Sequence, residues 1–473
     1  MSMPLYYQQA DGSIAYAPSF AGSRNTALLS MIFVAAHVPV ALAMKQYPVI
    51  STLHAVIILI IGLRYALGGK GLLEVTYAAA YLTGSEVLWR MTGASVPWEY
   101  GKYAIGLIVI LALMRRGHLR MPLLPTLYFV LLLPAIVPTV MEYFLTFDDV
   151  RQMVSANLSG PFALVACAWF FSYVKLNGRQ LEAMFLAIIG PTVGIAVIAL
   201  FSTVTAEHLR WGTQSNFVTS GGFGPNQVSG ALGLGVLMAL MLLLRSSRPL
   251  WFKGFIFATM AFLSIQSALT FSRGGLFGAL GAAMIASFYL IRDRKTRGRL
   301  VPIAIIIVLT TILVLPFLDN FTSGKLSARF ETIETTGRTE IAESDLRMWE
   351  RNPFLGVGIG MSMFRETGWK AAHTEFTRLV AEHGVLGLFA LLFLLFAGWR
   401  RLKTTPRTED KAMIAGMLGW SMLFMADKAM RLAAPSFMCG LSFATLTSEE
   451  DEQPRYLYAV VQPKQESLEA QNQ

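Results

Sequence analysis

Stretches of about 20 apolar residues recur along the whole chain, and each is long enough to cross a bilayer as a helix. Only 14% of the 473 residues are charged, whereas soluble domains carry about 25%. Such a chain cannot bury its apolar surface in water. The pattern therefore predicts an all-α, polytopic integral membrane protein with about 12–14 transmembrane helices. The predicted spans lie at about 27–44, 49–67, 71–89, 98–114, 121–141, 156–176, 181–202, 226–245, 250–271, 274–291, 300–318, 377–399, 411–427 and 432–447.

The loops between these spans predict the orientation of the chain. If the N-terminus is cytoplasmic, the loops on the inner side hold most of the basic residues, as cytoplasmic loops do. The net charge of +10 then reports topology, and we predict no nucleic-acid partner. The polar N-terminus lacks the apolar core of a cleavable signal peptide, so the first span is expected to remain as an anchor. The predicted inner basic residues include Arg115, Arg116, Arg120, Lys175, Arg179, Arg245, Arg248, Lys253, Arg292, Arg297, Arg400 and Arg401.

We predict a single polytopic membrane domain over residues 1–473, in which one loop differs from the others. Residues 319–375 are polar and of mixed charge, and they are predicted to form a large periplasmic loop. Within it, Ile341, Leu346 and Trp349 share one face of a short helix suited to the membrane interface. Residues 448–473 are polar and are predicted to form a cytoplasmic tail.

Two outer loops carry an arginine at the edge of a span, against the trend for basic residues to lie inside. Arg273 precedes Gly274 and Gly275, which would let backbone approach a bulky anionic ligand closely. A guanidinium offers a planar fork suited to phosphate oxygens. The alternative is an arginine that reaches lipid phosphate from a helix end. Arg210 precedes a Gly-rich loop, and for it the alternative is a salt bridge within that loop.

The long loop ends in a group of charges at the mouth of a span. Glu375, Arg378 and Glu382 lie at i, i+3 and i+7, on one stripe of a helix, and are expected to pair with one another. This pairing offsets the cost of bringing charge into the membrane. His373 precedes the stripe and is free to face a cavity; the alternative is a histidine that only fills space and forms hydrogen bonds. With an ordinary pKa near 6.5, it can accept a proton at neutral pH.

Other motifs exclude a metal or nucleotide cofactor. Cys167 and Cys439 both lie inside apolar runs and form neither a disulfide framework nor a metal site. The sequence "GVGIG" lacks the dinucleotide-binding fingerprint, and no Walker lysine follows it. Asp148 and Asp149 are the rival for a metal site, but adjacent acids are common in solvated loops. We predict no cofactor and no metal.

Three segments together resemble the O-antigen ligase and polymerase family. "GRTEIAESDLRMWERNPFLGVGIGMSMF", followed by "AAHTEFTRLVAEHGVLGLFALL", resembles its signature region. "FSRGG" resembles its Ser-Arg-Gly element, and "LRWGTQSNFVTSGGFGPNQVSGALGLG" its Arg-to-Gly-to-Pro-Asn element. The resemblance covers roughly residues 205–445. It implies a multi-pass enzyme of the bacterial inner membrane that transfers glycans from undecaprenyl diphosphate at the periplasmic side, without a metal.

The resemblance assigns roles to particular residues. Arg210 and Arg273 would hold the diphosphate, Arg338 would also face the cavity, and His373 would be the catalytic histidine. The implied activity is an inverting glycosyltransferase reaction, and the implied partners are the lipid-linked glycan donor, the acceptor and membrane lipids. We predict first an O-antigen ligase, for which the acceptor is the lipid A core.

Three other activities stay open on the residues alone. An O-antigen or exopolysaccharide polymerase, which joins repeat units, needs the same Arg–Arg–His set. The acceptor could also be a protein side chain. A transporter of lipid-linked sugars would place functional charges near the midplane and on both sides of the membrane. Here the candidate functional residues all lie on the outer side of the membrane, which favours an enzyme over a transporter.

Overall fold

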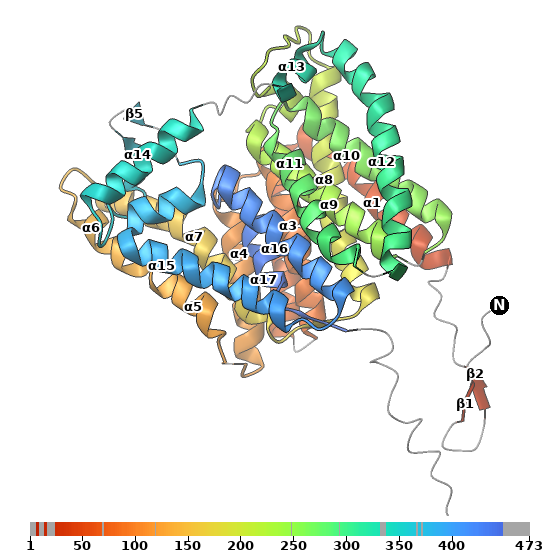
Figure 1. The fold of residues 1–473 in the computed structure, drawn as a ribbon, viewed down its shortest axis with the longest axis horizontal. Helices are drawn as coiled ribbons and strands as arrows, with labels where there is room; N and C mark the ends of the chain where they lie inside the picture. The colour runs from red at the N-terminus through yellow and green to blue at the C-terminus, as the bar shows by residue number, and fades with distance from the viewer. Residues whose placement is uncertain are drawn as a thin grey trace, which may run out of the picture.

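The computed structural model describes residues 6–8, 14–16, 24–68, 71–118, 120–246, 248–292, 294–331, 337–365, 368–369 and 372–447. Almost all regular structure in these residues is helical, so the predicted all-α class is confirmed (Figure 1). The long helices are α1 (Arg24–Gln46), α2 (Pro48–Leu67), α3 (Leu72–Met91), α4 (Tyr100–Arg115), α7 (Phe147–Phe171), α8 (Gly178–Val204), α9 (Pro225–Arg245), α10 (Leu250–Leu269), α11 (Gly274–Leu290), α12 (Arg294–Phe321), α14 (Arg338–Arg351), α15 (Glu375–Thr404) and α16 (Thr408–Lys428). The shorter helices are α5 (Leu123–Val130), α6 (Ile136–Met141), α13 (Lys325–Glu331) and α17 (Ala434–Leu441).

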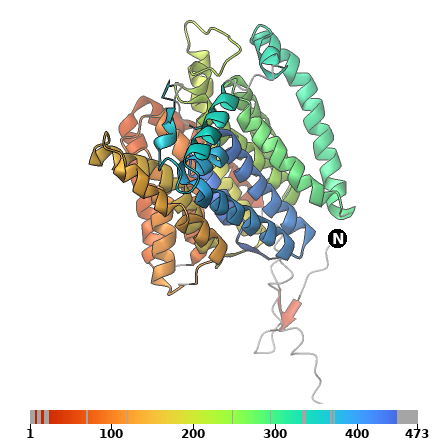
Figure 2. The ribbon, with the colours of Figure 1, turned by 60° about the vertical axis from the view of Figure 1, so that its left-hand side comes forward.

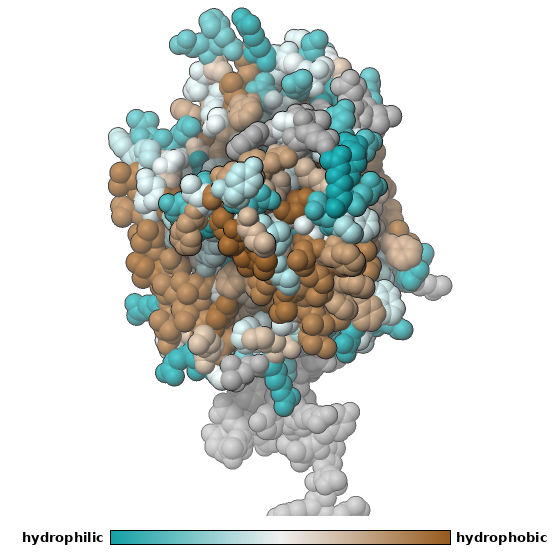
Figure 3. Space-filling view, turned by 90° about the vertical axis from the view of Figure 1, so that its left-hand side faces the viewer, coloured by the Kyte–Doolittle hydropathy of each residue, from teal (hydrophilic) through white to brown (hydrophobic). Residues whose placement is uncertain are grey.

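Nine of the described helices or helix pairs are long and apolar enough to cross a membrane. They comprise α1, α2, the α5–α6 pair, α7, α8, α9, α10, most of α12, and α15. Shorter or more polar helices, α3, α4, α11, α16 and α17, occupy the other predicted spans. A broad hydrophobic band crosses the face shown in Figure 3, with hydrophilic residues gathered above it. The protein is therefore a multi-pass membrane protein.

Helices α8 and α9 lie in the interior of the bundle, where 83% and 78% of the residues in their most apolar stretches are buried (Figure 1). No residue in the most apolar stretch of α12 is buried. Small residues allow the close packing inside, as is usual between membrane helices. A Cβ atom at Gly84 of α3 would lie 2.8 Å from the carbonyl oxygen of Ile188 in α8. Apolar residues on every side suit α12 to contact with lipid.

Helix α15 is broken at Gly384, whose backbone is left-handed with φ 60°. Residues 353–358 lie along this break. They form hydrogen bonds with backbone groups of α15 that the break leaves without a partner in the helix. Val385 donates a hydrogen bond to the carbonyl of Pro353 at 2.8 Å, and Val357 donates to that of Ala381 at 2.9 Å. Gly356 lies against the backbone of Glu382, where a side chain would clash. The glycine-rich sequence "GVGIG" thus serves helix packing.

Short strands complete the fold. They form pairs between β1 (Tyr6–Gln8) and β2 (Ile14–Tyr16), between β3 (Lys175–Leu176) and β6 (Thr445–Leu446), and between β4 (Phe364–Arg365) and β5 (Gly368–Trp369). The β3–β6 pair ties the segment after α17 to the segment between α7 and α8.

The segment predicted as the large loop, 319–375, contains α13 and α14 and ends where α15 begins. Helix α14 lies beside α15 above the bundle (Figures 1 and 2). Asp345 of α14 is fully buried and accepts a hydrogen bond from Thr377 Oγ1 at 2.7 Å. Ile341 is buried, whereas Leu346 is exposed. The predicted tail, residues 448–473, lies outside the described residues.

Candidate active site

Hydrogen bonds bring several helix ends together at one end of the bundle, which we call the outer end because the sequence assigns it to the periplasm. Arg90, in the last turn of α3, donates to Gln227 Oε1 of α9 at 2.8 Å and to the carbonyl of Arg431 at 3.3 Å. Ser272 Oγ, just before α11, donates to Asn226 Oδ1 of α9 at 2.8 Å. The starts of α9 and α11 and the segment after α16 therefore meet at one place.

The turn that carries Arg273 is held in an unusual conformation. Phe271 is left-handed, with φ 56°, which is uncommon for a residue with a side chain. Its carbonyl accepts a hydrogen bond from Arg329 Nε at 3.1 Å, and Arg273 Nη1 donates to the carbonyl of Arg329 at 3.4 Å. Ser229 Oγ donates to the carbonyl of Ser272 at 2.7 Å. These bonds offset the strain and fix the half-buried Arg273.

The two glycines after Arg273 do allow a close approach of other groups to the backbone, but these groups belong to the protein itself. A Cβ atom at Gly274 would overlap the Asp427 carboxylate and approach Lys428 Nζ. A Cβ atom at Gly275 would overlap the backbone carbonyl of Ser229. The expectation that these glycines admit an anionic ligand is thus replaced by a packing role. They bring α11 against α16 and α9.

Positive charge gathers beside this turn. Asp427, near the end of α16, forms ion pairs with both Arg338 of α14 and the buried Lys428. Arg431 Nη2 donates to the carbonyl of Ala372 at 2.9 Å. Burial lowers the pKa of the Arg431 guanidinium, and the nearby positive charge of Arg338 acts in the same direction. We call Arg273, Arg338, Lys428 and Arg431 the cationic cluster.

A cavity of about 340 Å³ opens next to this cluster. Arg431 and Ala372 line it, and His373 follows Ala372 directly, half-buried and one residue before Thr374, the N-cap of α15. The start of α15 thus holds His373 at the edge of the cavity. The cavity is lined by Trp98, Glu99, Lys102, Ala156, Asn157, Gln227, Gly360, Ser362, Met363, Ala372, Glu375, Arg378, Glu382, Ala429, Met430 and Arg431.

The acidic stripe of α15 pairs as the sequence predicts. Arg378 donates to Glu375 Oε1 at 2.5 Å and to Glu382 Oε2 at 2.6 Å, and all three side chains are buried. At the start of α4, which also lines the cavity, Lys102 Nζ lies 2.5 Å from Oε2 of Glu99, the N-cap residue. We call these five residues the paired-charge cluster. Their position in the cavity lining was not predicted from the sequence.

Arg210 is exposed on the loop between α8 and α9. The next residue, Trp211, packs on Phe271 with ring centroids 5.5 Å apart. Asn216 donates from Nδ2 to the Arg210 carbonyl at 3.3 Å and from its backbone N–H to the Thr270 carbonyl at 2.9 Å. The loop is therefore anchored beside the Arg273 turn, and the guanidinium of Arg210 faces solvent.

The sequence analysis did not single out Arg90, Asp427, Lys428 or Arg431. A signal for the three basic residues was present, because each falls at the outer end of a predicted span, against the positive-inside trend. The same reasoning that selected Arg273 would have selected them. The sequence gives no comparable signal for Asp427. A single carboxylate at the end of a span is common, and its role becomes clear only from the residues that it contacts in the structure.

The remaining acidic and sulfur groups have structural roles. Asp149 completes the capping box of α7 with Thr146, and Asp148 forms an exposed ion pair with Arg151. Cys167 and Cys439 are free and buried. In the part of the chain that the structure describes, no group of three or more His, Cys, Asp and Glu side chains is placed to hold a metal ion.

Fold and site together define a multi-pass membrane protein with a cavity at one end of its helices, lined by acidic and basic side chains, among them Arg431 of the cationic cluster. The family model described as O-antigen ligase matches residues 258–392, and this match confirms the resemblance that the sequence motifs carry. The matched segment includes Arg273, Arg338 and His373, but not Arg210. It supports glycan transfer of the ligase or polymerase type. Comparison with curated proteins gives no match.

Proposed function

We propose that the protein transfers a glycan from undecaprenyl diphosphate to an acceptor hydroxyl at the periplasmic face of the bacterial inner membrane. We propose further that it is an O-antigen ligase, with the lipid A core as acceptor. The observation that carries this proposal is the cavity flanked by the cationic cluster and by His373. Clustered guanidinium groups suit the diphosphate of the donor.

The proposed reaction is a single displacement. The acceptor oxygen attacks the anomeric carbon, the bond from that carbon to the diphosphate oxygen breaks, and the diphosphate leaves with the electron pair. His373 accepts the proton of the attacking hydroxyl. One displacement inverts the configuration at the anomeric carbon.

The cationic cluster would act on the leaving group. Negative charge grows on the diphosphate as the bond breaks, so Arg273 and Arg338 stabilise the transition state more than the ground state. Arg210, on the loop anchored beside the Arg273 turn, is proposed as a further diphosphate contact. Because guanidinium groups supply the compensating charge, the proposal needs no metal ion.

Transfer by the purified full-length protein in lipid nanodiscs tests this proposal. The donor is a glycan on undecaprenyl diphosphate, offered with lipid A core or with a second lipid-linked repeat unit, in excess chelator. We expect transfer to the lipid A core. Transfer to the repeat unit alone would identify a polymerase. Transfer that requires added magnesium would contradict the metal-free mechanism.

A further inference from the structure

We infer that the part of the cavity lined by the paired-charge cluster binds an uncharged sugar ring of the acceptor, with Trp98 as its stacking surface. This inference rests on the proposed function, because it divides one cavity between donor and acceptor. The donor diphosphate would lie beside the cationic cluster, and the acceptor sugar beside the paired-charge cluster.

Both cations of the paired-charge cluster are already paired with carboxylates of the protein. Arg378 is held between Glu375 and Glu382, and Lys102 is held by Glu99 and lies 3.3 Å from Ser159 Oγ. Three carboxylates here face two cations. A diphosphate would meet like charge on this side, which costs free energy across an interface. A neutral ligand meets no such penalty.

The same groups can still bind hydroxyls. An ionised carboxylate has about four lone-pair sites. The contacts of Glu99 with Ser159 and Lys102, and of Glu382 with Ser362 and Arg378, use only part of them. Ser362 Oγ donates to Glu382 Oε1 at 2.7 Å, and Asn157 Oδ1 accepts from Arg378 Nη1 at 3.3 Å. A few fixed polar groups in a cavity of this size are what orient a small polar ligand.

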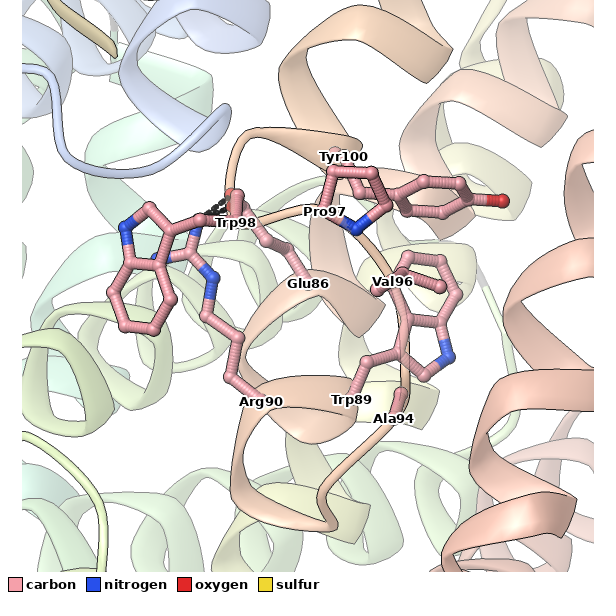
Figure 4. Close-up of a pocket in the computed structure, with 9 residues that line it drawn as sticks. Glu86, Trp89, Arg90, Ala94, Val96, Pro97, Trp98 and Tyr100 are labelled. Atoms are coloured by element: carbon pink, nitrogen blue, oxygen red, sulfur yellow. Dashed lines mark hydrogen bonds and ion pairs between the residues drawn. The ribbon is translucent and has the colours of Figure 1, made fainter. Parts of the chain in front are cut away.

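Trp98 gives this region an apolar surface. Its side chain is 57% exposed, although it lines both the large cavity and an adjoining one of about 110 Å³ (Figure 4). The guanidinium of Arg90 lies 4.5 Å from its ring centroid, and Phe223 packs at 6.0 Å. Arg90 also donates to the Trp98 carbonyl at 2.8 Å. The indole is therefore held in place while much of its surface remains open to a ligand.

The chain offers a matched control in Trp399, at the inner end of α15. Its side chain is 53% exposed, Lys403 Nζ lies 5.1 Å from its ring centroid, and Phe396 stacks at 5.3 Å. Both tryptophans could anchor the protein at a membrane interface, where such residues are common. A sugar-binding role belongs to Trp98 alone, because Trp399 lines neither cavity.

The test is calorimetric titration of the full-length protein in nanodiscs with two probes, the core oligosaccharide released from lipid A and undecaprenyl diphosphate. We expect Trp98→Ala to weaken oligosaccharide binding about tenfold, the loss of roughly one aromatic contact. Asn157→Ala should weaken it by about three- to tenfold, the loss of one hydrogen bond. Undecaprenyl diphosphate affinity should be unchanged in both variants, and Trp399→Ala should bind both probes like wild type.

Salt gives a second readout. Raising ionic strength from about 0.1 M to about 1 M shortens the screening length from about 10 Å to about 3 Å. Undecaprenyl diphosphate affinity should fall several-fold, and oligosaccharide affinity should not change. Wild-type protein that does not bind the oligosaccharide, or a Trp98→Ala protein that binds it normally, would overturn the inference. Because binding is measured without turnover, a failure to transfer glycan would instead count against the proposed function.

Discussion

The two charged clusters at the cavity differ in how their charges are balanced. In the paired-charge cluster, Arg378 lies between two carboxylates and is buried. In the cationic cluster, Arg338 and Lys428 share one carboxylate, that of Asp427, and burial together with the nearby charge of Arg338 lowers the pKa of Arg431. Charge that is matched inside the protein holds the structure together. Charge in excess is available to bind an anion.

The largest expected effect is at His373, which directly follows Ala372 of the cavity lining. His373→Ala should lower kcat about 10²- to 10⁴-fold, the usual contribution of a general base. Donor affinity should be unchanged, because the histidine is not assigned to the diphosphate. Transfer assays and donor titration on the same preparation check both points. His208→Ala, an exposed histidine on the α8–α9 loop, is the control and should be fully active. A His373→Ala enzyme of near-normal kcat would remove the proposed catalyst.

The next-largest effect is on the stability of Arg378→Ala, and it tests whether Arg378 holds the structure together or binds a ligand. Arg378→Ala leaves the buried carboxylates of Glu375 and Glu382 without their cation, so the free energy of unfolding should fall by about 3–5 kcal/mol. Arg151→Ala removes an exposed pair and should change it by less than about 0.5 kcal/mol. Denaturant unfolding in detergent, followed by tryptophan fluorescence, measures both. If Arg378→Ala were as stable as wild type but inactive, Arg378 would belong to the catalytic machinery.

A smaller effect tests the contact between α11 and α16. Gly274→Ala would push a methyl group into the Asp427 carboxylate, at a cost of about 1–3 kcal/mol, and transfer should fall about tenfold as the cationic cluster shifts. Gly278→Ala, on the same helix, meets no atom closer than Trp420 Nε1 at 4.0 Å. It should be neutral or slightly stabilising, since alanine favours helix. Equal activity of the two variants would show that the cluster does not depend on this contact.

Hydropathy predicted the fold well because membrane insertion depends on local sequence. The spans at 226–245 and 250–271 match α9 and α10 within two residues. The stripe of Glu375, Arg378 and Glu382 was also predictable, because helical spacing alone brings those side chains together.

The site was harder to predict because its groups come from distant parts of the chain. Arg90 reaches Gln227 and Arg431 only after α3, α9 and α16 have packed. Spacing gives no hint that Asp427 meets Arg338. The sequence also did not indicate that the Arg210 guanidinium faces solvent, since that depends on how Trp211 anchors its loop.

The central claim is that Arg273 and its neighbours bind the donor diphosphate through guanidinium groups. Titration of undecaprenyl diphosphate into Arg273→Lys protein tests it most directly, since lysine keeps the charge but loses the two-pronged hydrogen bond. We expect the affinity of the Arg273→Lys protein to be about 10- to 100-fold weaker than that of wild type, while His373→Ala binds normally. Wild-type affinity in the Arg273→Lys protein would show that the Arg273 guanidinium does not bind the diphosphate.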